Sequence, residues 1–422
     1  MIEEKNWVEK YQKPEEQLET YYGLPRKIVF CKKCVVSNQR PASTAEFKHV
    51  ISSKKVTMNI DEEGVCDACR QAEIKENVNW EVREKELTAL LDQYRRNDGE
   101  YDCIVSGSGG KDSAFQAHVL KYKYGMNPLT VTWPPILYTD YGYQNWKNWI
   151  EVGGFDNILF KQNGRAMKIL TRLSIENLFH PFQTFILGQK NLAPKIAAKF
   201  GVPLIFYGEN EAEYGNPIAD NATSLRDKSY FTYSNLEDLF LGGVSVKELI
   251  QKYDLRLNEL KCFLPASEEE LKGRDIFVHY LGYYLKWIPQ EVYYYAVENT
   301  GFRARPFRTQ GTYSKYNSID DKIDDLHYYT TFIKFGIGRA TYDASQEIRN
   351  RHLTRDEGKA LVKKFDGEFP DRYFNEIMEY LEMDPGYFRE QLTNRFRSPH
   401  LWAVEDGKWH LRHTVNSDGY DD

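Results

Sequence analysis

The chain has 422 residues, of which 41% are hydrophobic and 28% are charged, as expected for a globular protein of two or three domains. Its formal net charge of -6 argues mildly against a nucleic-acid partner. No apolar run reaches the ~20 residues that a membrane span needs, and the first residues lack the apolar core of a signal peptide, so we expect a cytoplasmic protein.

The first motif in the chain is a set of four cysteines in two Cys-x-x-Cys pairs. The pairs are Cys31 with Cys34 and Cys66 with Cys69. Each pair places two thiolates on one tight turn, and two such turns complete a tetrahedral zinc site. The intervening residues 35–65 are longer than a usual zinc ribbon and contain an expected strand at 55–60. An iron–sulfur cluster is the main alternative, whereas a cytosolic setting disfavours disulfides.

A helix is expected after the cysteines. Trp80, Leu87, Leu91 and Tyr94 recur at helical spacing, and Asn97-Asp98-Gly99 ends the pattern. We therefore group residues 1–98 as an N-terminal arm, a zinc module and a linking helix. A site closed by four thiolates has no open coordination position, so its role would be architectural.

The most informative stretch runs from residue 101 to residue 122. Tyr101–Val105 is an apolar segment that suits a buried strand, and the residues after position 113 have helical spacing. The turn between them is rich in glycine, which allows backbone N–H groups to converge on one point. The N-terminus of the following helix adds its own unpaired N–H groups. The sequence therefore predicts a phosphate-binding loop.

Two common phosphate motifs do not fit this loop. In the Walker motif, Gly-Lys is followed by Ser or Thr, but here Asp112 follows Lys111; in the dinucleotide motif a third glycine would stand at position 112. Residues 108–113, Ser-Gly-Gly-Lys-Asp-Ser, instead resemble the motif of the PP-loop pyrophosphatase superfamily, whose members split ATP between the α- and β-phosphates. The candidate nucleotide-binding residues of the loop are Ser106, Gly107, Ser108, Gly109, Gly110, Lys111, Asp112 and Ser113.

Alternating strands and helices follow the loop. Strands are expected at 129–133, 157–161 and 202–207, and helices at 144–152, 165–178 and 182–200. This alternation predicts an α/β fold with a doubly wound parallel sheet over residues 99–211. Ligands bind such sheets at the carboxyl ends of the strands.

Three further candidates lie at those carboxyl ends. We place Trp133 beside the adenine, with core packing as the alternative, and Gly208 beside the nucleotide. Glu209 or Glu211 is expected to reach magnesium or substrate, with a solvated loop carboxylate as the alternative.

Residues 212–275 are polar and irregular, with a helix expected near 246–253, and we interpret them as an insertion or partner-facing module. The aromatic run 276–287 has helical spacing, so a helix is expected there. One face of it, including Tyr283, would line a sugar site or fill the core. Residues 276–422 are expected to form a helical, substrate-binding region.

An unusually polar segment lies at 311–349. On a helix, Asp320 and Asp324 would lie one turn apart, as would Asp321 and Asp325. A solvated acidic face is one interpretation. The other is a polar substrate pocket, because the acids are mixed with Lys, Arg, Tyr and His. On that interpretation Lys315 and Asp321 are candidate catalytic residues with Asp112 and Ser113, and the substrate-binding candidates are Glu209, Tyr283, Lys315, Asp320, Arg339 and Arg349.

The combination of these motifs resembles the N-acetyl sugar amidotransferase family. The resemblance rests on the cysteine module, the PP-loop, residues 313–325 and the segment Phe-Gly-Ile-Gly-Arg-Ala-Thr at 335–341, and it covers most of residues 30–400. It implies a role in bacterial surface polysaccharide, O-antigen or flagellin-glycan synthesis. It also implies conversion of a sugar acetamido group into an acetamidino group, with ATP, Mg²⁺ held by Asp112, and a phosphate contact from Ser113.

The resemblance further implies separate partner subunits, a glutaminase and a cyclase-like protein, that supply ammonia. Cys103 and Cys262 lie in no recognisable nucleophile motif, in keeping with a chain that has no glutaminase of its own. Two alternatives stay open. One is a PP-loop enzyme that thiolates tRNA, and the other is a non-catalytic ATP- and zinc-binding scaffold of a glycan assembly complex.

Overall fold

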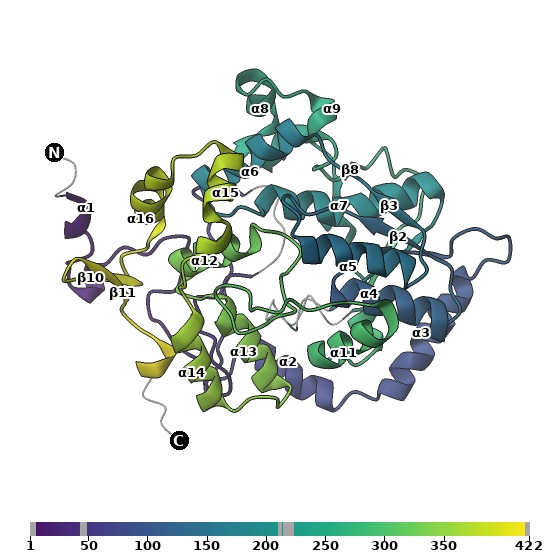
Figure 1. Ribbon diagram of the computed structural model, residues 1–422, viewed down its shortest axis with the longest axis horizontal. Coiled ribbons are helices and arrows are strands. Elements are labelled where there is room, and N and C mark those ends of the chain that lie inside the picture. Colours follow the sequence, from purple (N-terminus) through teal and green to yellow (C-terminus); the bar gives the residue numbers. More distant parts are fainter. Residues whose placement is uncertain (1–5, 43–48, 210–212, 214–222, 418–422) are drawn as a thin grey trace.

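A five-stranded parallel sheet forms the centre of the molecule. The computed structural model describes residues 6–42, 49–209, 213 and 223–417 (Figure 1). The sheet has the order β3-β2-β1-β4-β9, with every neighbouring pair parallel. The predicted doubly wound parallel α/β fold is therefore confirmed. The strands are β1 (Cys103–Ser106), β2 (Pro128–Thr132), β3 (Asn157–Leu159), β4 (Leu204–Tyr207) and β9 (Phe277–Tyr280).

Helices cover both faces of this sheet. Successive side chains of a strand point to opposite faces, so Ile104 and Ile205 join one core while Val105 and Phe206 join the other. The first core includes α6 (Gly164–Leu178) and α7 (Gln183–Phe200). The second includes α3 (Trp80–Tyr94), α4 (Lys111–His118), α5 (Asp140–Glu151) and α11 (Pro289–Thr300).

The strand order reverses between β1 and β4. The chain runs outward from β1 to β2 and β3, then returns to the other side of β1 to form β4 and β9. The loops after β1 and β4 therefore diverge over one crevice, which is where open α/β sheets bind ligands. Ser106 and Tyr207 end these two strands, so the PP-loop and the Gly208-Glu209 turn meet at this switch point.

Two predicted elements are wrong. The run 276–287 is not one helix: Phe277–Tyr280 pairs with β4 as the fifth strand, and only α10 (Leu281–Tyr284) follows as a short helix. A short apolar run is ambiguous between strand and helix, and pairing with β4 decides it here. The strand expected at 55–60 is also not formed, since Thr57 and Ile60 make only isolated bridges.

The module after β4 packs on the main body. The helix expected near 246–253 is confirmed as α8, and Leu239, Leu249 and Phe263 join the core that contains α6 and α7. In Figure 1, α8 and α9 form a protrusion above α6. The elements here are β5 (Thr232–Tyr233), β6 (Phe240–Leu241), β7 (Val244–Ser245), α8 (Val246–Lys252), α9 (Leu257–Leu260) and β8 (Ala266–Ser267).

The C-terminal region is mainly helical. It contains α12 (Asp324–Phe335), α13 (Arg339–Arg349), α14 (Arg355–Phe365), α15 (Asp371–Leu381), α16 (Thr393–Phe396) and the hairpin β10 (Trp402–Glu405) and β11 (Lys408–Leu411). Thr354 and Glu357 form a capping box at the start of α14.

The N-terminal arm packs against this C-terminal region. The Tyr11 hydroxyl donates to the carbonyl oxygen of Arg397 at 2.9 Å, and the amide of Tyr21 donates to Ser398 Oγ at 2.9 Å. Figure 1 accordingly shows α1 (Asn6–Glu9) beside the β10–β11 hairpin. The division of the chain into four units stays a prediction.

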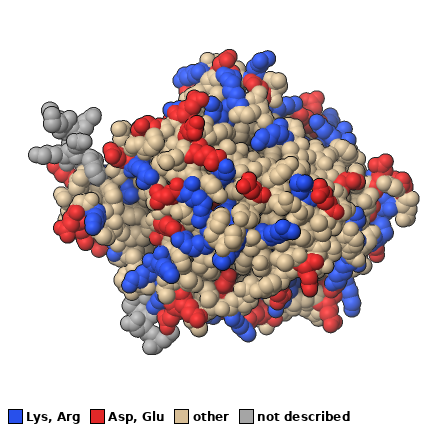
Figure 2. All heavy atoms as spheres, viewed as in Figure 1, with Lys and Arg blue, Asp and Glu red and all other residues tan. Residues whose placement is uncertain are grey.

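Charged side chains of both signs are distributed over the surface of the molecule that Figure 2 shows. On the face drawn in Figure 2, Lys and Arg are interspersed with Asp and Glu, and neither sign forms a continuous area. Among the described helices, none combines the length and the apolar character required to cross a bilayer.

Candidate active site

The PP-loop connects β1 to α4 through a backbone that only glycine permits. Gly109 has a φ of +84°, and a Cβ atom on it would lie 2.6 Å from the Cα of Trp146. A Cβ on Gly107 would lie 2.0 Å from the Cβ of Ser113, closer than side chains approach. Gly110 is the N-cap of α4. The loop amides and the first turn of the helix thus form a cradle suited to phosphate.

The polar side chains of the loop have distinct partners. Lys111 is buried, and its Nζ lies 2.7 and 2.8 Å from the two carboxylate oxygens of Asp112. The side chain of Asp112 nevertheless remains 42% exposed, so its carboxylate is accessible from the cavity above the loop. Ser113 Oγ donates to the carbonyl oxygen of Gly110 at 3.0 Å, which fixes the hydroxyl at the helix N-terminus.

The loop faces a cavity of about 250 Å³. Residues 108–112 form one side of it. The opposite side, which we call the C-terminal wall, consists of residues 316–320 together with Arg339 and Gln346 of α13. The remaining lining residues are Gly142, Asn145, Glu209 and Phe302.

One hydrogen bond joins the loop to the C-terminal wall. Ser108 Oγ donates to Asp320 Oδ2 at 2.8 Å. The backbone of Asp320 is also held, because its carbonyl oxygen accepts a hydrogen bond from the Thr139 amide at 3.0 Å. Gly142 allows this close approach, since a Cβ atom added to it would lie 2.4 Å from the Cα of Asp320. The wall is therefore positioned against the PP-loop by contacts on both its side-chain and its backbone atoms.

Glu209 is the second carboxylate of the cavity. Burial, and then the neighbouring charge of Asp112, raise its pKa to about 8. Its Oε1 accepts a hydrogen bond from Gln346 Nε2 at 3.1 Å. Two carboxylates that repel each other in a partly buried cavity are suited to share a divalent cation, whose charge would favour ionisation of both. Glu211, the alternative candidate, lies outside the described residues.

Several predicted site residues lie in this cavity. The structure brings Ser108, Gly109, Gly110, Lys111 and Asp112 together with Glu209, Asp320 and Arg339, and Gly208 adjoins the cavity through Glu209. Sequence reasoning missed Asn145, Tyr316, Asn317 and Gln346. Tyr316, Asn317 and Gln346 belong to the polar segment 311–349 that the sequence singled out, whereas no local pattern indicated Asn145.

Asp321 and Lys315 do not line the cavity. Asp321 is buried, and its carboxylate accepts hydrogen bonds from the amides of Ile136, Leu137 and Ile323, so it connects the loop after β2 to the C-terminal wall. Lys315 is exposed. The expected pairing of Asp320 with Asp324 on one helix is wrong, because α12 begins only at Asp324.

The other three predicted residues also lie elsewhere. Trp133 is buried in the core against Phe160 and Phe263, which corresponds to the alternative of core packing. The ring of Tyr283 packs under the guanidinium of Arg83 at 3.8 Å. Arg349 Nη2 donates to the carbonyl oxygen of Glu213 at 3.1 Å and lines a separate cavity of about 70 Å³.

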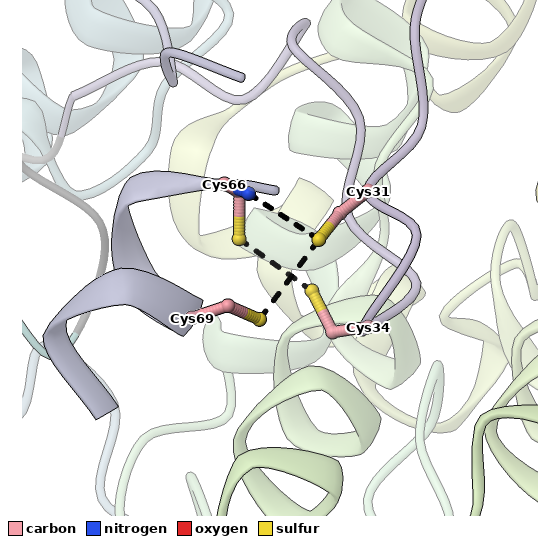
Figure 3. A group of neighbouring side chains, drawn as sticks. All are labelled: Cys31, Cys34, Cys66 and Cys69. Atoms are coloured by element: carbon pink, nitrogen blue, oxygen red, sulfur yellow. Dashed lines mark hydrogen bonds between the residues drawn. The ribbon is translucent and has the colours of Figure 1, made fainter. Parts of the chain in front are cut away.

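The four cysteines converge in one buried cluster. Cys31 and Cys34 come from one turn, while Cys66 and Cys69 come from the start of α2 (Asp67–Glu76), as Figure 3 shows. The Sγ–Sγ distances are 3.9 Å for Cys31–Cys69 and 3.7 Å for Cys34–Cys66. All four sulfur atoms lie within 4.8 Å of one another, so the cluster could bind zinc or an iron–sulfur centre.

The fold and the loop define a parallel α/β protein with a phosphate-type loop of the PP-loop pattern and a four-cysteine module. Residues 310–416, which include the C-terminal wall, match the family described as LPS biosynthesis protein WbpG-like, C-terminal domain. This match fits the N-acetyl sugar amidotransferase family that the motifs predicted. Together the phosphate loop and the matched domain support an ATP-using enzyme of glycan biosynthesis.

Other similarities are more distant. An uncharacterized protein of Methanocaldococcus jannaschii is 35% identical over 83 residues, which are 20% of this chain and 29% of that protein. The NMN synthetase from Francisella tularensis aligns with 54% of this chain and 89% of its own at 16% identity and a TM-score of 0.24. The U34-tRNA thiolase NcsA from Methanococcus maripaludis, solved with its [4Fe-4S] cluster, aligns with 74% and 85% at 12% identity and a TM-score of 0.30. Structural alignments this loose carry no functional argument.

Proposed function

We propose that the chain is an ATP-dependent, AMP-forming amidotransferase that converts the acetamido group of an N-acetylated sugar nucleotide into an acetamidino group. The observation that carries the proposal is the shared cavity, in which the PP-loop faces a wall from the matched C-terminal domain. A phosphate loop alone fits many ATP-using enzymes. The Ser108–Asp320 contact brings that loop to the polar segment on which the family resemblance depends.

The proposed reaction solves a specific chemical problem. Resonance gives the amide C–N bond partial double-bond character, so the acetamido carbonyl is a poor electrophile. Attack of its oxygen on the α-phosphorus of ATP forms an O-adenylyl imidate and releases pyrophosphate. Ammonia then adds to the imidate carbon and loses a proton. The C–O bond breaks, and AMP leaves with the former amide oxygen.

The residues of the cavity suit these steps. The amides of the PP-loop and of the first turn of α4 would stabilise the charge that develops on the departing pyrophosphate. Asp112 and Glu209 would hold Mg²⁺, which supplies charge neutralisation on the phosphates. The pKa of Glu209 near 8 without a cation indicates that cation binding would displace a proton from this carboxylate.

We assign the cysteine module to zinc. Four sulfurs at ~2.3 Å from a tetrahedral zinc ion lie about 3.8 Å apart; the Cys31–Cys69 and Cys34–Cys66 distances are 3.9 and 3.7 Å, and all four sulfurs lie within 4.8 Å of one another. An iron–sulfur cluster binds its cysteines through different iron atoms, which requires wider spacing. Metal analysis of the purified chain should find about one zinc per chain; iron together with acid-labile sulfide would overturn the assignment.

Cysteine placement also disfavours the thiolase alternative. No cysteine lines the cavity among the residues that the structure describes. Cys103 is fully buried within β1, where burial raises the pKa of its thiol, and Cys262 lies beyond α9. A sulfur-transfer reaction would need a reactive thiolate near the nucleotide.

The ammonia is proposed to come from a separate glutaminase subunit. The purified chain should then use ammonium salts but not glutamine. Efficient use of glutamine by the chain alone would contradict this part of the proposal, while leaving the adenylation step intact.

Isotope transfer tests the reaction directly. A UDP-linked N-acetyl sugar labelled with ¹⁸O in its acetamido group is incubated with ATP, Mg²⁺ and ammonium. We expect the label in AMP and a sugar lighter by about one dalton relative to an unlabelled substrate as oxygen is exchanged for NH. Release of ADP, or AMP that stays unlabelled while product forms, would contradict the mechanism. Absence of turnover with CMP-linked as well as UDP-linked sugars would favour a scaffold.

A further inference from the structure

A second, larger cavity adjoins the active site. It has a volume of about 340 Å³ and lies between α12, α13, the start of α7 and the described residues 40–42, 49 and 55. Arg339 lines both this cavity and the cavity above the PP-loop. We call it the basic cavity, because Arg40, Lys55, Lys334 and Arg339 line it together with three histidines.

Two cations of the basic cavity, Arg40 and Lys334, are buried without a carboxylate beside them in its described lining, whereas Arg339 pairs with Asp343 at 2.9 Å. Among the lining residues that the structure describes there is no carboxylate. Lys334 is 4% exposed, and its Nζ donates to the carbonyl oxygen of Leu178 at 2.7 Å. Arg40 is also 4% exposed, and its Nε has no hydrogen-bond partner among the described residues. Buried cations normally have an anionic partner, since desolvating an unpaired charge is costly.

The titration of these groups agrees with their geometry. Burial, and then the charge of Lys55, lower the pKa of Lys334 to about 7. Burial likewise lowers the pKa of His49 and of His327 to about 3, with Lys334 contributing to both. The cavity is thus an environment in which cationic groups oppose one another's ionisation until an anion enters.

The basic cavity and the cavity above the PP-loop are linked by shared lining residues along α13. Arg339, Tyr342 and Gln346 lie on one face of α13 at helical spacing. A small cavity of about 70 Å³ along this face shares Arg40, Arg339 and Tyr342 with the basic cavity, and Arg339 and Gln346 with the cavity above the PP-loop. The three cavities therefore follow α13 in series.

The basic cavity also has an extended apolar wall. Phe179, Ile186, Leu187 and Phe335 line it, and the aromatic ring of Tyr342 lies 5.0 Å from the guanidinium of Arg40. Cations that can pair with phosphates, beside apolar and aromatic surface that can contact a base, are the features expected of a nucleotide site.

We infer that the basic cavity binds the nucleoside diphosphate portion of the acceptor, so that the sugar extends along α13 toward the PP-loop. This inference rests on the proposed function for the identity of the acceptor. It assigns to Arg40 and Lys334 the recognition of the diphosphate and leaves ATP to the PP-loop.

Calorimetric titration of the full chain with UDP tests this assignment. The PP-loop is first saturated with α,β-methylene-ATP, so that UDP cannot occupy it. We expect UDP to bind at one site, and Lys334→Met and Arg40→Met each to weaken that binding at least tenfold. Lys247→Met is the matched control, because Lys247 is an exposed residue of α8. We expect this variant to bind UDP with the affinity of the wild type. Retained binding of the ATP analogue shows that each variant is folded.

Three outcomes would overturn the inference: no UDP binding to the wild type, full competition between UDP and the ATP analogue, or UDP affinity unchanged in both cavity variants. Inorganic pyrophosphate that binds as tightly as UDP would also contradict a nucleoside site. The isotope experiment is independent of these results. Labelled AMP without UDP binding in the basic cavity refutes only the inference, whereas UDP binding there without pyrophosphate release refutes only the proposed reaction.

Discussion

The two sides of the active-site cavity are built by different means. The PP-loop side is shaped by backbone, because Gly107 and Gly109 leave no room for a Cβ. The C-terminal wall depends on side chains: the Asp320 carboxylate accepts a hydrogen bond from Ser108. Behind the wall, the buried Asp321 carboxylate accepts from the amides of Ile136 and Leu137. A backbone cradle recognises any phosphate, whereas a side-chain wall can be specific for one acceptor. The following predictions test this division.

The largest effect is expected from Gly107→Ala. The added Cβ would lie 2.0 Å from the Cβ of Ser113, so the start of α4 must shift away from the phosphate position. Loss of aligned loop donors should reduce pyrophosphate release at least ~100-fold and weaken binding of α,β-methylene-ATP. The matched control is Gly164→Ala, because a Cβ on Gly164 meets no atom within 4 Å. Near-normal rates in Gly107→Ala would show that the loop is not the phosphate site.

The next effect concerns the attachment of the C-terminal wall. In Asp321→Asn, an NH₂ group replaces one of two oxygens that accept backbone N–H groups, which should destabilise the fold by about 2 kcal/mol at pH 5. Denaturant titration measures this difference. The rate with saturating substrates should change less than in Gly107→Ala, because Asp321 holds the wall in place and does not line the cavity.

The same variant should show a defined pH dependence. Burial raises the pKa of Asp321 to about 7, so between pH 4 and pH 7 the folded chain keeps a proton that the unfolded chain has lost. The contribution of this group to stability is therefore greatest in acid and decreases as pH rises to 7. Asn does not titrate, so the difference in the free energy of unfolding between the wild type and Asp321→Asn should decrease from pH 5 to pH 8. A gap that widens would contradict the raised pKa.

The contrast between the two sides also explains what the sequence could predict. The PP-loop could be predicted from the sequence because its strand, its glycines and its helix are contiguous, so the pattern of neighbouring residues identifies all three. The C-terminal wall could be predicted only in part: the sequence indicated a polar segment, but it did not indicate that the adjacent residues Asp320 and Asp321 have different partners. Nothing local distinguishes Asp320, which contacts Ser108, from Asp321, which is buried under the loop after β2. Likewise, the pairing of β9 with β4 made a strand of residues that have helical periodicity.

A smaller effect is expected where the two sides touch. Asp320→Ala removes the acceptor of the Ser108 hydroxyl and should lower kcat/KM for the acceptor about tenfold, equivalent to ~1.4 kcal/mol, with little change in melting temperature. Ser108→Ala removes the same contact, so the double variant should be little worse than either single variant. Asp320→Asn keeps an acceptor oxygen and should recover part of the activity. Fully additive losses would mean that the two residues act separately.

The smallest effect, and the only stabilising one, is expected from Lys334→Met. Lys334 is a buried cation whose pKa falls to about 7, against 10.5 for an ordinary lysine. As pH falls from 10 to 7 the unfolded chain takes up a proton that the folded chain does not, so this lysine lowers wild-type stability across that window and adds no further change below it. Methionine removes the penalty at the cost of one hydrogen bond to Leu178, so the variant should be more stable by about 1 kcal/mol at pH 7.

This gain should be much smaller near pH 10, where the lysine of the unfolded wild-type chain begins to lose its proton, and thermal denaturation at both pH values measures it. Lys247→Met, at an exposed position, should show no comparable trend. A variant that is destabilised at pH 7 would indicate that Lys334 serves the fold. A residue that lowers stability yet is required for UDP binding is explained by function, because packing alone would favour an apolar side chain there.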